Sequence, residues 1–123
     1  MAAEAASRRP RFVADVGLSR ALVARYEALG ITELFDWQQH ALGEPGVLDG
    51  RSNLLYTAST SGGKTLVAEL LMLRRLEGAG QRAKALVVLP LKALVVQKSA
   101  ELSKLLHQTG LKVAPYMSGC GEL

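Results

Sequence analysis

Apolar residues near the N-terminus recur at helical spacing. This spacing predicts a helix that Ser19 caps, that runs to about Leu29 and that stops at Gly30. A second, shorter helix is predicted over residues 32–42. Glycine and proline then interrupt residues 43–52, which is typical of a loop.

From residue 53 onward, short apolar runs alternate with helical patterns. The runs predict strands over residues 53–57, 85–89 and 111–116, and the patterns between them predict helices over residues 63–77 and 92–108. The second run is uninterrupted, as in a strand that is buried on both faces. Three strands joined by two crossover helices predict a parallel α/β sheet.

The stretch between the first strand and its helix has the residues of a phosphate-binding loop. It reads Ala58-Ser59-Thr60-Ser61-Gly62-Gly63-Lys64-Thr65. Backbone N–H groups there would point at an anion, and Gly62 and Gly63 would let the backbone approach it. Lys64 would reach the β- and γ-phosphates of a nucleotide, and the Thr65 hydroxyl would bind Mg²⁺. An ordinary Gly-rich turn before a helix would leave the Lys-Thr pair unexplained.

Composition narrows the function classes without choosing among them. With 123 residues, 49% of them hydrophobic, the chain can form a small domain or part of a larger one. Its net charge of +4 is compatible with a nucleic-acid partner and equally with an ordinary soluble protein. The single cysteine, Cys120, permits no internal disulfide and indicates a reducing compartment. No apolar run is long enough to cross a membrane, so we expect no membrane partner.

We predict three segments along the chain. Residues 1–17 would form a disordered tail, residues 18–52 the leading helices, and residues 53–123 the nucleotide-binding part. Residues 1–11 are rich in Ala and Arg, which also faintly suggests an organelle transit peptide, although Glu4 and the short length argue against it.

Together these motifs resemble the start of a superfamily 2 helicase motor domain, similar to the helicase-like domain of DNA polymerase theta and its helicase-only relatives. The matching residues are Trp37-Gln38, residues 53–56, 58–69 and 89–94, and Gln97-Lys98. Ala58 replaces the more common Gly, as in many superfamily 2 helicases. The resemblance runs from about Leu18 to Tyr116. It implies a three-layer, RecA-like P-loop fold, incomplete here, with residues 53–123 as the first half of the ATP-binding domain.

The resemblance also implies a role for Gln38. It corresponds to the glutamine that reads adenine, and its amide offers a donor and an acceptor to the adenine edge. The alternative is that Gln38 is a surface residue of its helix. Phe35 and Trp37 are better explained by packing than by base stacking, because aromatic residues are usually buried.

Pro90, Lys92 and Leu94 resemble the helicase motif that touches the nucleic-acid backbone. Lys92 and N–H groups at a helix start would meet phosphates there. The alternative is that Pro90 merely ends a strand and that Lys92 is solvated.

The carboxylates that hydrolysis requires do not follow a predicted strand. One is needed to hold Mg²⁺ through water and another to orient the attacking water. After the loop the acidic residues are Glu69, Glu77, Glu101 and Glu122, and none ends a strand. The Asp-Glu motif, the second motor domain and its arginine finger are absent, so no catalytic set is complete. We therefore expect the chain alone to be inactive in hydrolysis and unwinding.

The resemblance implies the ATP-binding segment of an ATP-dependent 3′–5′ DNA helicase or translocase that acts in DNA repair in the nucleus. ATP and Mg²⁺ would be its cofactors. Single-stranded DNA or a 3′-tailed duplex would bind through the full protein, with the remainder of the helicase chain as partner. A stand-alone, non-hydrolysing nucleotide-binding or interaction module is the main alternative. An RNA helicase and a small-molecule P-loop kinase are further ones, although a kinase would not need Gln38 or the Pro90 motif.

Overall fold

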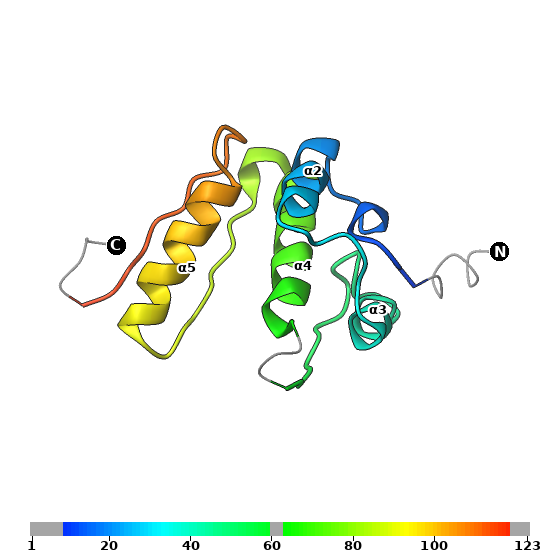
Figure 1. The fold of residues 1–123 in the computed structure, drawn as a ribbon. Coiled ribbons are helices and arrows are strands. Elements are labelled where there is room, and N and C mark those ends of the chain that lie inside the picture. The colour runs from blue at the N-terminus through cyan, green and yellow to red at the C-terminus, as the bar shows by residue number, and fades with distance from the viewer. Residues whose placement is uncertain (1–8, 60–62, 119–123) are drawn as a thin grey trace. The chain divides into compact units, whose positions relative to one another are not determined.

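A computed structural model describes residues 9–59 and 63–118 of the chain. The chain forms two compact units, Met1–Ala85 and Leu86–Leu123. In the described part, the elements of the first unit are η1 (Val13–Asp15), α2 (Arg20–Ala28), α3 (Asp36–Leu42), α4 (Lys64–Gly78) and η2 (Gly80–Arg82) (Figure 1). The second unit contains α5 (Lys92–Leu105). None of the helices in the described ranges is long and apolar enough to cross a membrane.

Local signals in the sequence determine how α2 begins and ends. The Ser19 hydroxyl oxygen accepts a hydrogen bond from the Leu22 N–H at 3.3 Å, which caps the helix. Gly30 follows the helix with φ at 81°, a conformation that favours glycine. The predicted cap and stop are both confirmed.

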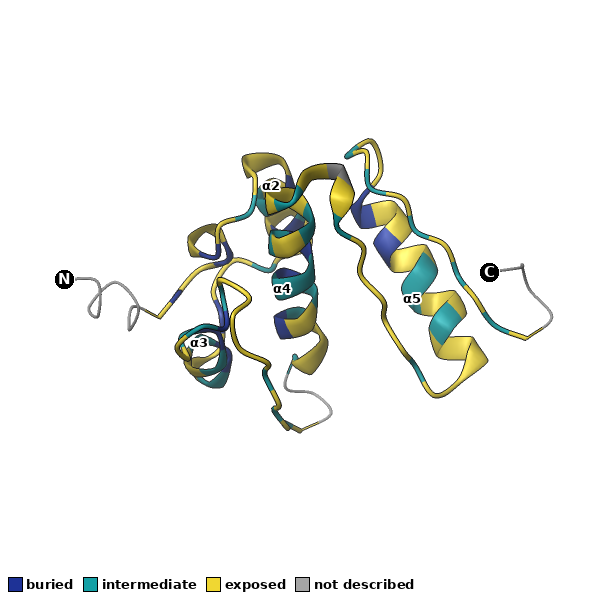
Figure 2. Ribbon diagram, turned by 180° about the vertical axis from the view of Figure 1, so that it is seen from behind, coloured by how far each residue is buried: buried dark blue, intermediate teal, exposed yellow. Residues whose placement is uncertain are grey.

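The core of the first unit lies between α2, α3, α4 and the chain that precedes α2. Figure 2 shows the buried faces of these helices turned inward. In this unit the buried apolar residues are Val13, Val16, Leu22, Tyr26, Leu34, Leu42, Val47, Val67, Leu70 and Leu73. Burying each such side chain stabilises the fold by roughly 1.5–3 kcal/mol. The core therefore forms from helices and loops, with no sheet among the described residues.

The chain before α2 takes part in this core. Phe12 and Glu33 form an isolated antiparallel bridge, and the Val13 N–H donates to the Thr32 carbonyl at 2.9 Å. Val13 and Val16 are buried. This packing differs from the disordered tail that we expected over residues 1–17, of which residues 1–8 lie outside the described part. It also explains why α3 begins at Asp36 rather than at residue 32, because the preceding residues pair with the entering chain.

The predicted three-stranded sheet is not formed within the described residues. Residues 53–57, 85–89 and 111–116 carry no strand assignment there. Leu55, Leu86 and Val88 are 96%, 85% and 81% exposed. A parallel strand obtains its hydrogen bonds only from neighbouring strands, and its apolar side chains need both faces covered. These segments therefore have the sequence pattern of strands, but they lack the neighbouring strands with which they would form hydrogen bonds.

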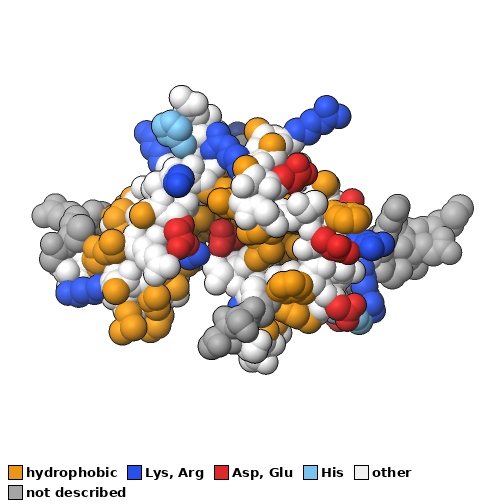
Figure 3. Space-filling model, in the orientation of Figure 1, with side chains coloured by type: hydrophobic (Ala, Val, Ile, Leu, Met, Phe, Trp, Pro, Cys, Tyr) orange, Lys and Arg blue, Asp and Glu red, His pale blue; other side chains and the backbone are white. Residues whose placement is uncertain are grey.

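The second unit has a smaller buried core. Leu102 and Leu105 of α5 are buried, as is Leu106 after it. Apolar side chains are exposed over the start of the helix, as Figure 3 shows. The helix ends at Leu105, earlier than predicted, because a turn follows in which the Thr109 hydroxyl donates to the Leu106 carbonyl at 2.6 Å.

Candidate nucleotide-binding site

The predicted phosphate-binding loop ends at the start of α4. Gly63 is the N-cap residue, with φ at 76° and ψ at 34° in the left-handed region. A Cβ at this position would lie 2.6 Å from Gln38 Nε2 and would also be strained by the positive φ. Only glycine fits here without displacing Gln38. Thr60, Ser61 and Gly62 lie outside the described residues.

The first turn of α4 carries chemistry suited to an anion. No side chain caps the helix, and its first turn contains no acidic residue. The N-cap glycine offers these first N–H groups no side-chain acceptor, and the helix dipole adds partial positive charge at this end. Lys64 and Thr65 are both exposed at the first two helical positions. A nucleotide phosphate with its Mg²⁺ fits this set of donors.

Gln38 links α3 to the start of α4. Its side chain is only 2% exposed, so the alternative of a surface residue is wrong. Its Oε1 accepts from the Phe35 N–H at 2.8 Å, and its Nε2 donates to the Gly63 carbonyl at 2.9 Å. An amide has two donor hydrogens and two acceptor lone pairs, so each atom keeps a further hydrogen-bonding position. The adenine-reading role stays a prediction.

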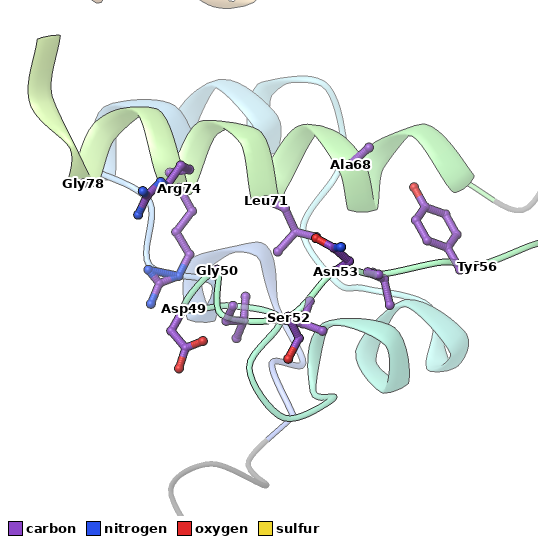
Figure 4. A pocket seen from close by; sticks show the side chains of 13 residues that line it. Asp49, Gly50, Ser52, Asn53, Tyr56, Ala68, Leu71, Arg74 and Gly78 are labelled. Atoms are coloured by element: carbon purple, nitrogen blue, oxygen red, sulfur yellow. The ribbon is translucent and has the colours of Figure 1, made fainter. Parts of the chain in front are cut away.

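Tyr56 contacts the same turn from the other side, and the sequence reasoning missed it. Its hydroxyl donates to the Lys64 carbonyl at 2.6 Å. Figure 4 shows the ring beside α4 with its hydroxyl turned toward the helix. Burial raises the pKa of Tyr56 above its ordinary value. The available signal was the period-two pattern of Leu54, Tyr56 and Ala58, which places a polar group on the half-buried side.

The two aromatic residues before Gln38 differ in their surroundings. The Trp37 ring packs against the Tyr56 ring, with centroids 5.6 Å apart and planes inclined by 33°. This contact agrees with the packing role predicted for Trp37. Phe35 is mostly exposed, so the same prediction is wrong for it.

Two carboxylates of α4 attach the helix to α2. Tyr26 Oη donates to Glu69 Oε1 at 3.3 Å, and the Ser19 N–H donates to Glu77 Oε1 at 2.8 Å. Burial, and then the Glu69 carboxylate, raise the pKa of Tyr26 far above its ordinary value. These two glutamates therefore help to hold α4 against α2.

A cavity of about 530 Å³ lies along α4, away from the predicted phosphate contacts (Figure 4). Residues 47–56 line one side of it, and Ala68, Leu71 and Arg74 of α4 line the other. Arg74 is half-buried. Its Nε is buried without a hydrogen-bond partner among the described residues.

The predicted nucleic-acid contacts lie in the second unit, at the start of α5. Pro90 and Lys92 flank the N-cap residue Leu91, and Lys92 is exposed at the first helical position. The N–H groups of Leu94 and Val95 donate to the Leu91 carbonyl at 3.1 and 3.2 Å. Neither a capping side chain nor an acidic residue occupies this first turn. Contact between this turn and a nucleic-acid backbone remains a prediction.

Comparison with known families identifies the group to which this arrangement belongs. Residues 37–122, more than half of the chain, match the DEAD/DEAH box helicase family. The chain belongs to that family. The match begins next to Gln38 and includes α4 and α5, so the candidate residues on all three helices lie within the helicase segment.

Individual relatives confirm the resemblance seen in the sequence. Mouse DNA polymerase theta is 43% identical over 105 residues, which are 85% of this chain and 4% of that protein. The human protein named helicase POLQ-like is 40% identical over 84% of the chain and 9% of its own length. The ATP-dependent DNA helicase Hel308 of Methanocella arvoryzae is 41% identical over 82% of the chain and 14% of its own length. The chain thus spans a small part of these relatives.

Family membership implies the RecA-like P-loop fold and ATP binding, generally with Mg²⁺. The structure adds that the described residues of this helicase segment fold as helices, with the sheet segments extended and unpaired. Among the described residues, no group of three or more His, Cys, Asp or Glu side chains could hold a metal ion.

Proposed function

We propose that this chain is the ATP-binding segment of an ATP-dependent DNA helicase and that it binds MgATP at the start of α4. The observation that carries the proposal is the first turn itself. An uncapped helix follows a left-handed glycine and presents Lys64 and Thr65 to solvent, inside the helicase match. The names of two relatives, DNA polymerase theta and ATP-dependent DNA helicase, support the assignment to an ATP-dependent DNA helicase.

Different residues of the loop would contact different parts of the nucleotide. The backbone N–H groups of residues 58–65 would cradle the phosphates, Lys64 would pair with the β- and γ-phosphates, and the Thr65 hydroxyl would bind Mg²⁺. The metal ion neutralises phosphate charge when it is bound. The free donor and acceptor positions of the Gln38 amide would read the adenine edge.

We further propose that residues 53–57, 85–89 and 111–116 become strands of the RecA-like sheet in the whole protein. Two properties support this assignment. Half-buried and exposed positions alternate over residues 53–59 and 111–118, which is the period of extended backbone. The large apolar side chains of Leu55, Leu86 and Val88 are exposed, as expected of segments whose neighbouring strands are supplied from elsewhere.

The whole protein would bind DNA in part through the start of α5. Pro90, Lys92 and Leu94 lie where an uncapped helix start and an exposed lysine can meet phosphates. From the family resemblance we propose that it would move 3′–5′ on single-stranded DNA or a 3′-tailed duplex, in DNA repair in the nucleus. The chain alone would not hydrolyse ATP, because it lacks the Asp-Glu motif.

A non-hydrolysing nucleotide-binding module is the second candidate. The observation that favours it is the engagement of Glu69 and Glu77 with α2, which removes the two nearest carboxylates that follow the loop from catalysis. Under this alternative the chain binds nucleotide and never turns it over.

Calorimetric titration of the 123-residue chain with MgATP tests the proposal. Lys64→Ala should weaken binding at least tenfold, because it removes the cation that faces the phosphates, about 1.4 kcal/mol or more. Lys84→Ala, another exposed lysine of the same unit, is the matched control and should bind as the original chain does. Equal affinity in the two variants would overturn the assignment of the site. Mg²⁺-dependent ATP hydrolysis that disappears with Lys64→Ala would overturn the prediction that the chain is inactive alone.

A further inference from the structure

We propose that Tyr56 is a positioning residue for the nucleotide site, and that its hydroxyl fixes the first turn of α4 from which Lys64 and Thr65 project. This inference rests on the proposed function and gives a role to a residue that the phosphate-loop motif does not include and to which the resemblance assigns none. It also gives Trp37 a role, because the Tyr56 ring packs against the Trp37 ring.

Two consecutive carbonyls at the start of α4 accept hydrogen bonds from side chains outside the helix. Gln38 Nε2 donates to the Gly63 carbonyl at 2.9 Å, and Tyr56 Oη donates to the Lys64 carbonyl at 2.6 Å. The bond from buried Gln38 is partly shielded from water, whereas the bond from half-buried Tyr56 lies at the surface. The turn that presents the phosphate-binding groups is therefore held by two donors.

The Tyr56 hydroxyl lies between two backbone groups at the start of α4. It donates to the Lys64 carbonyl, and the Ala68 N–H acts on the phenol oxygen in the direction that lowers the pKa of Tyr56, against the larger effect of burial. Lys64 and Ala68 are four residues apart, the spacing of the bonds within an α-helix. A change at this hydroxyl thus affects the geometry of the first turn directly.

The hydroxyl also joins the two ends of the phosphate-binding loop. Tyr56 precedes the loop and Lys64 ends it, eight residues later. Fixing both ends lowers the conformational entropy that the chain loses on binding a ligand, which raises affinity without a new contact to that ligand. Tyr56 acts through the backbone of Lys64 and touches no nucleotide atom.

Packing alone would also explain an aromatic residue at this position. The Tyr56 ring contacts the Trp37 ring at 5.6 Å between centroids, and a buried phenol hydroxyl usually finds some acceptor. The two explanations differ in what the hydroxyl does. Tyr56→Phe keeps the ring and its contact with Trp37 and removes only the hydroxyl.

The test compares MgATP with inorganic tripolyphosphate as ligands of the 123-residue chain. Tyr56→Phe should weaken both by the same factor, about threefold to tenfold, since one hydrogen bond that orients the phosphate site is lost. Tyr116→Phe makes the same chemical change at an exposed tyrosine and is the matched control, with no change expected. Gln38→Ala should weaken ATP more than tripolyphosphate.

Circular dichroism reports on the fold of each variant, including the one that lacks the single tryptophan, Trp37, which lies against the Tyr56 ring. If Tyr56→Phe does not fold by this measure, Trp37→Phe takes its place and should weaken both ligands equally, by about twofold. Hydrogen exchange at the Ala68 amide should be faster in Tyr56→Phe even without nucleotide, while exchange in α5 stays unchanged.

The outcomes separate this inference from the proposed function. Unchanged binding of both ligands by folded Tyr56→Phe, with binding lost in Lys64→Ala, overturns the role of Tyr56 and leaves the nucleotide site standing. Unchanged binding by both variants overturns the site, and the role of Tyr56 with it. Weakened ATP binding with unchanged tripolyphosphate binding also overturns the inference, because the hydroxyl would then act on the adenosine part.

Discussion

The two compact units differ in how far their apolar residues are buried. In residues 9–85, helices α2 and α4 bury leucines such as Leu22, Leu70 and Leu73. In residues 86–118, Leu86 and Val88 are exposed, and the described core is limited to three leucines at the end of α5. Apolar content alone therefore does not determine how well a segment is buried.

The difference follows from how each kind of segment satisfies its backbone. A helix forms its hydrogen bonds internally, so α2, α3 and α4 need only side-chain contacts with one another. An extended segment needs another strand beside it for every hydrogen bond along its length. The first unit consists mainly of helices, whereas the second unit begins with an extended segment.

The two units can be compared by substitution, and the largest effect on stability is expected in the core of α4. Leu70→Ala removes a fully buried side chain and should lower the free energy of unfolding of the first unit by about 2–5 kcal/mol. Leu94→Ala, a partly exposed leucine of α5, is the counterpart in the second unit and should change stability by about 0.5 kcal/mol or less. Urea unfolding followed by Trp37 fluorescence measures the first unit, and circular dichroism follows the whole chain. Equal losses of stability in the two variants would contradict the difference in burial between the two units.

A smaller effect is expected where α2 contacts α4. Tyr26→Phe removes the hydrogen bond to Glu69 and should cost about 1 kcal/mol at neutral pH. Because the pKa of Tyr26 is raised in the folded chain, the unfolded chain ionises this group first, near its ordinary pKa of 10.0. The contribution is therefore complete below pH 10 and is lost as the pH rises above it.

Urea unfolding of Tyr26→Phe and the original chain at pH 7 and at pH 10.5 measures this change. The stability difference should be smaller at the higher pH, since only the original chain has this phenol to ionise. A difference that stays constant or grows with pH would contradict the assigned cause of the raised pKa.

The smallest effect on stability is expected at the exposed start of the second unit. Leu86→Lys should change the free energy of unfolding by no more than about 0.5 kcal/mol, because Leu86 is 85% exposed. It should also reduce self-association, since it places a charge on an unpaired apolar segment. Sedimentation velocity of the two chains at equal concentration measures the second effect. A clear loss of stability would mean that Leu86 is buried within the isolated chain.

Local features of the fold could be predicted from the sequence. The Ser19 cap, the Gly30 stop and the start of α4 at Lys64 agree with prediction, because each depends on residues within one helical turn. The helicase resemblance was likewise confirmed, because its motifs are short and contiguous.

Features that depend on distant partners could not be predicted in the same way. The apolar runs have the pattern of strands, yet whether a strand forms depends on residues far away or on another chain segment. Tyr56 was missed because its acceptor, the Lys64 carbonyl, is a backbone atom that no sequence motif marks. The burial of Gln38 was missed because helical spacing alone did not show that α3 packs against the start of α4.

The hydrogen bond from the Ser19 N–H to Glu77 has a consequence for how the chain can be divided. The sequence places a boundary at residue 53, just before the nucleotide loop. The carboxylate at the far end of α4, however, satisfies the backbone at the start of α2, and Tyr26 meets Glu69 between them. A shortened protein that begins at residue 53 would expose Leu70 and Leu73 and lose both bonds. A piece that keeps the packing of α4 therefore includes the leading helices.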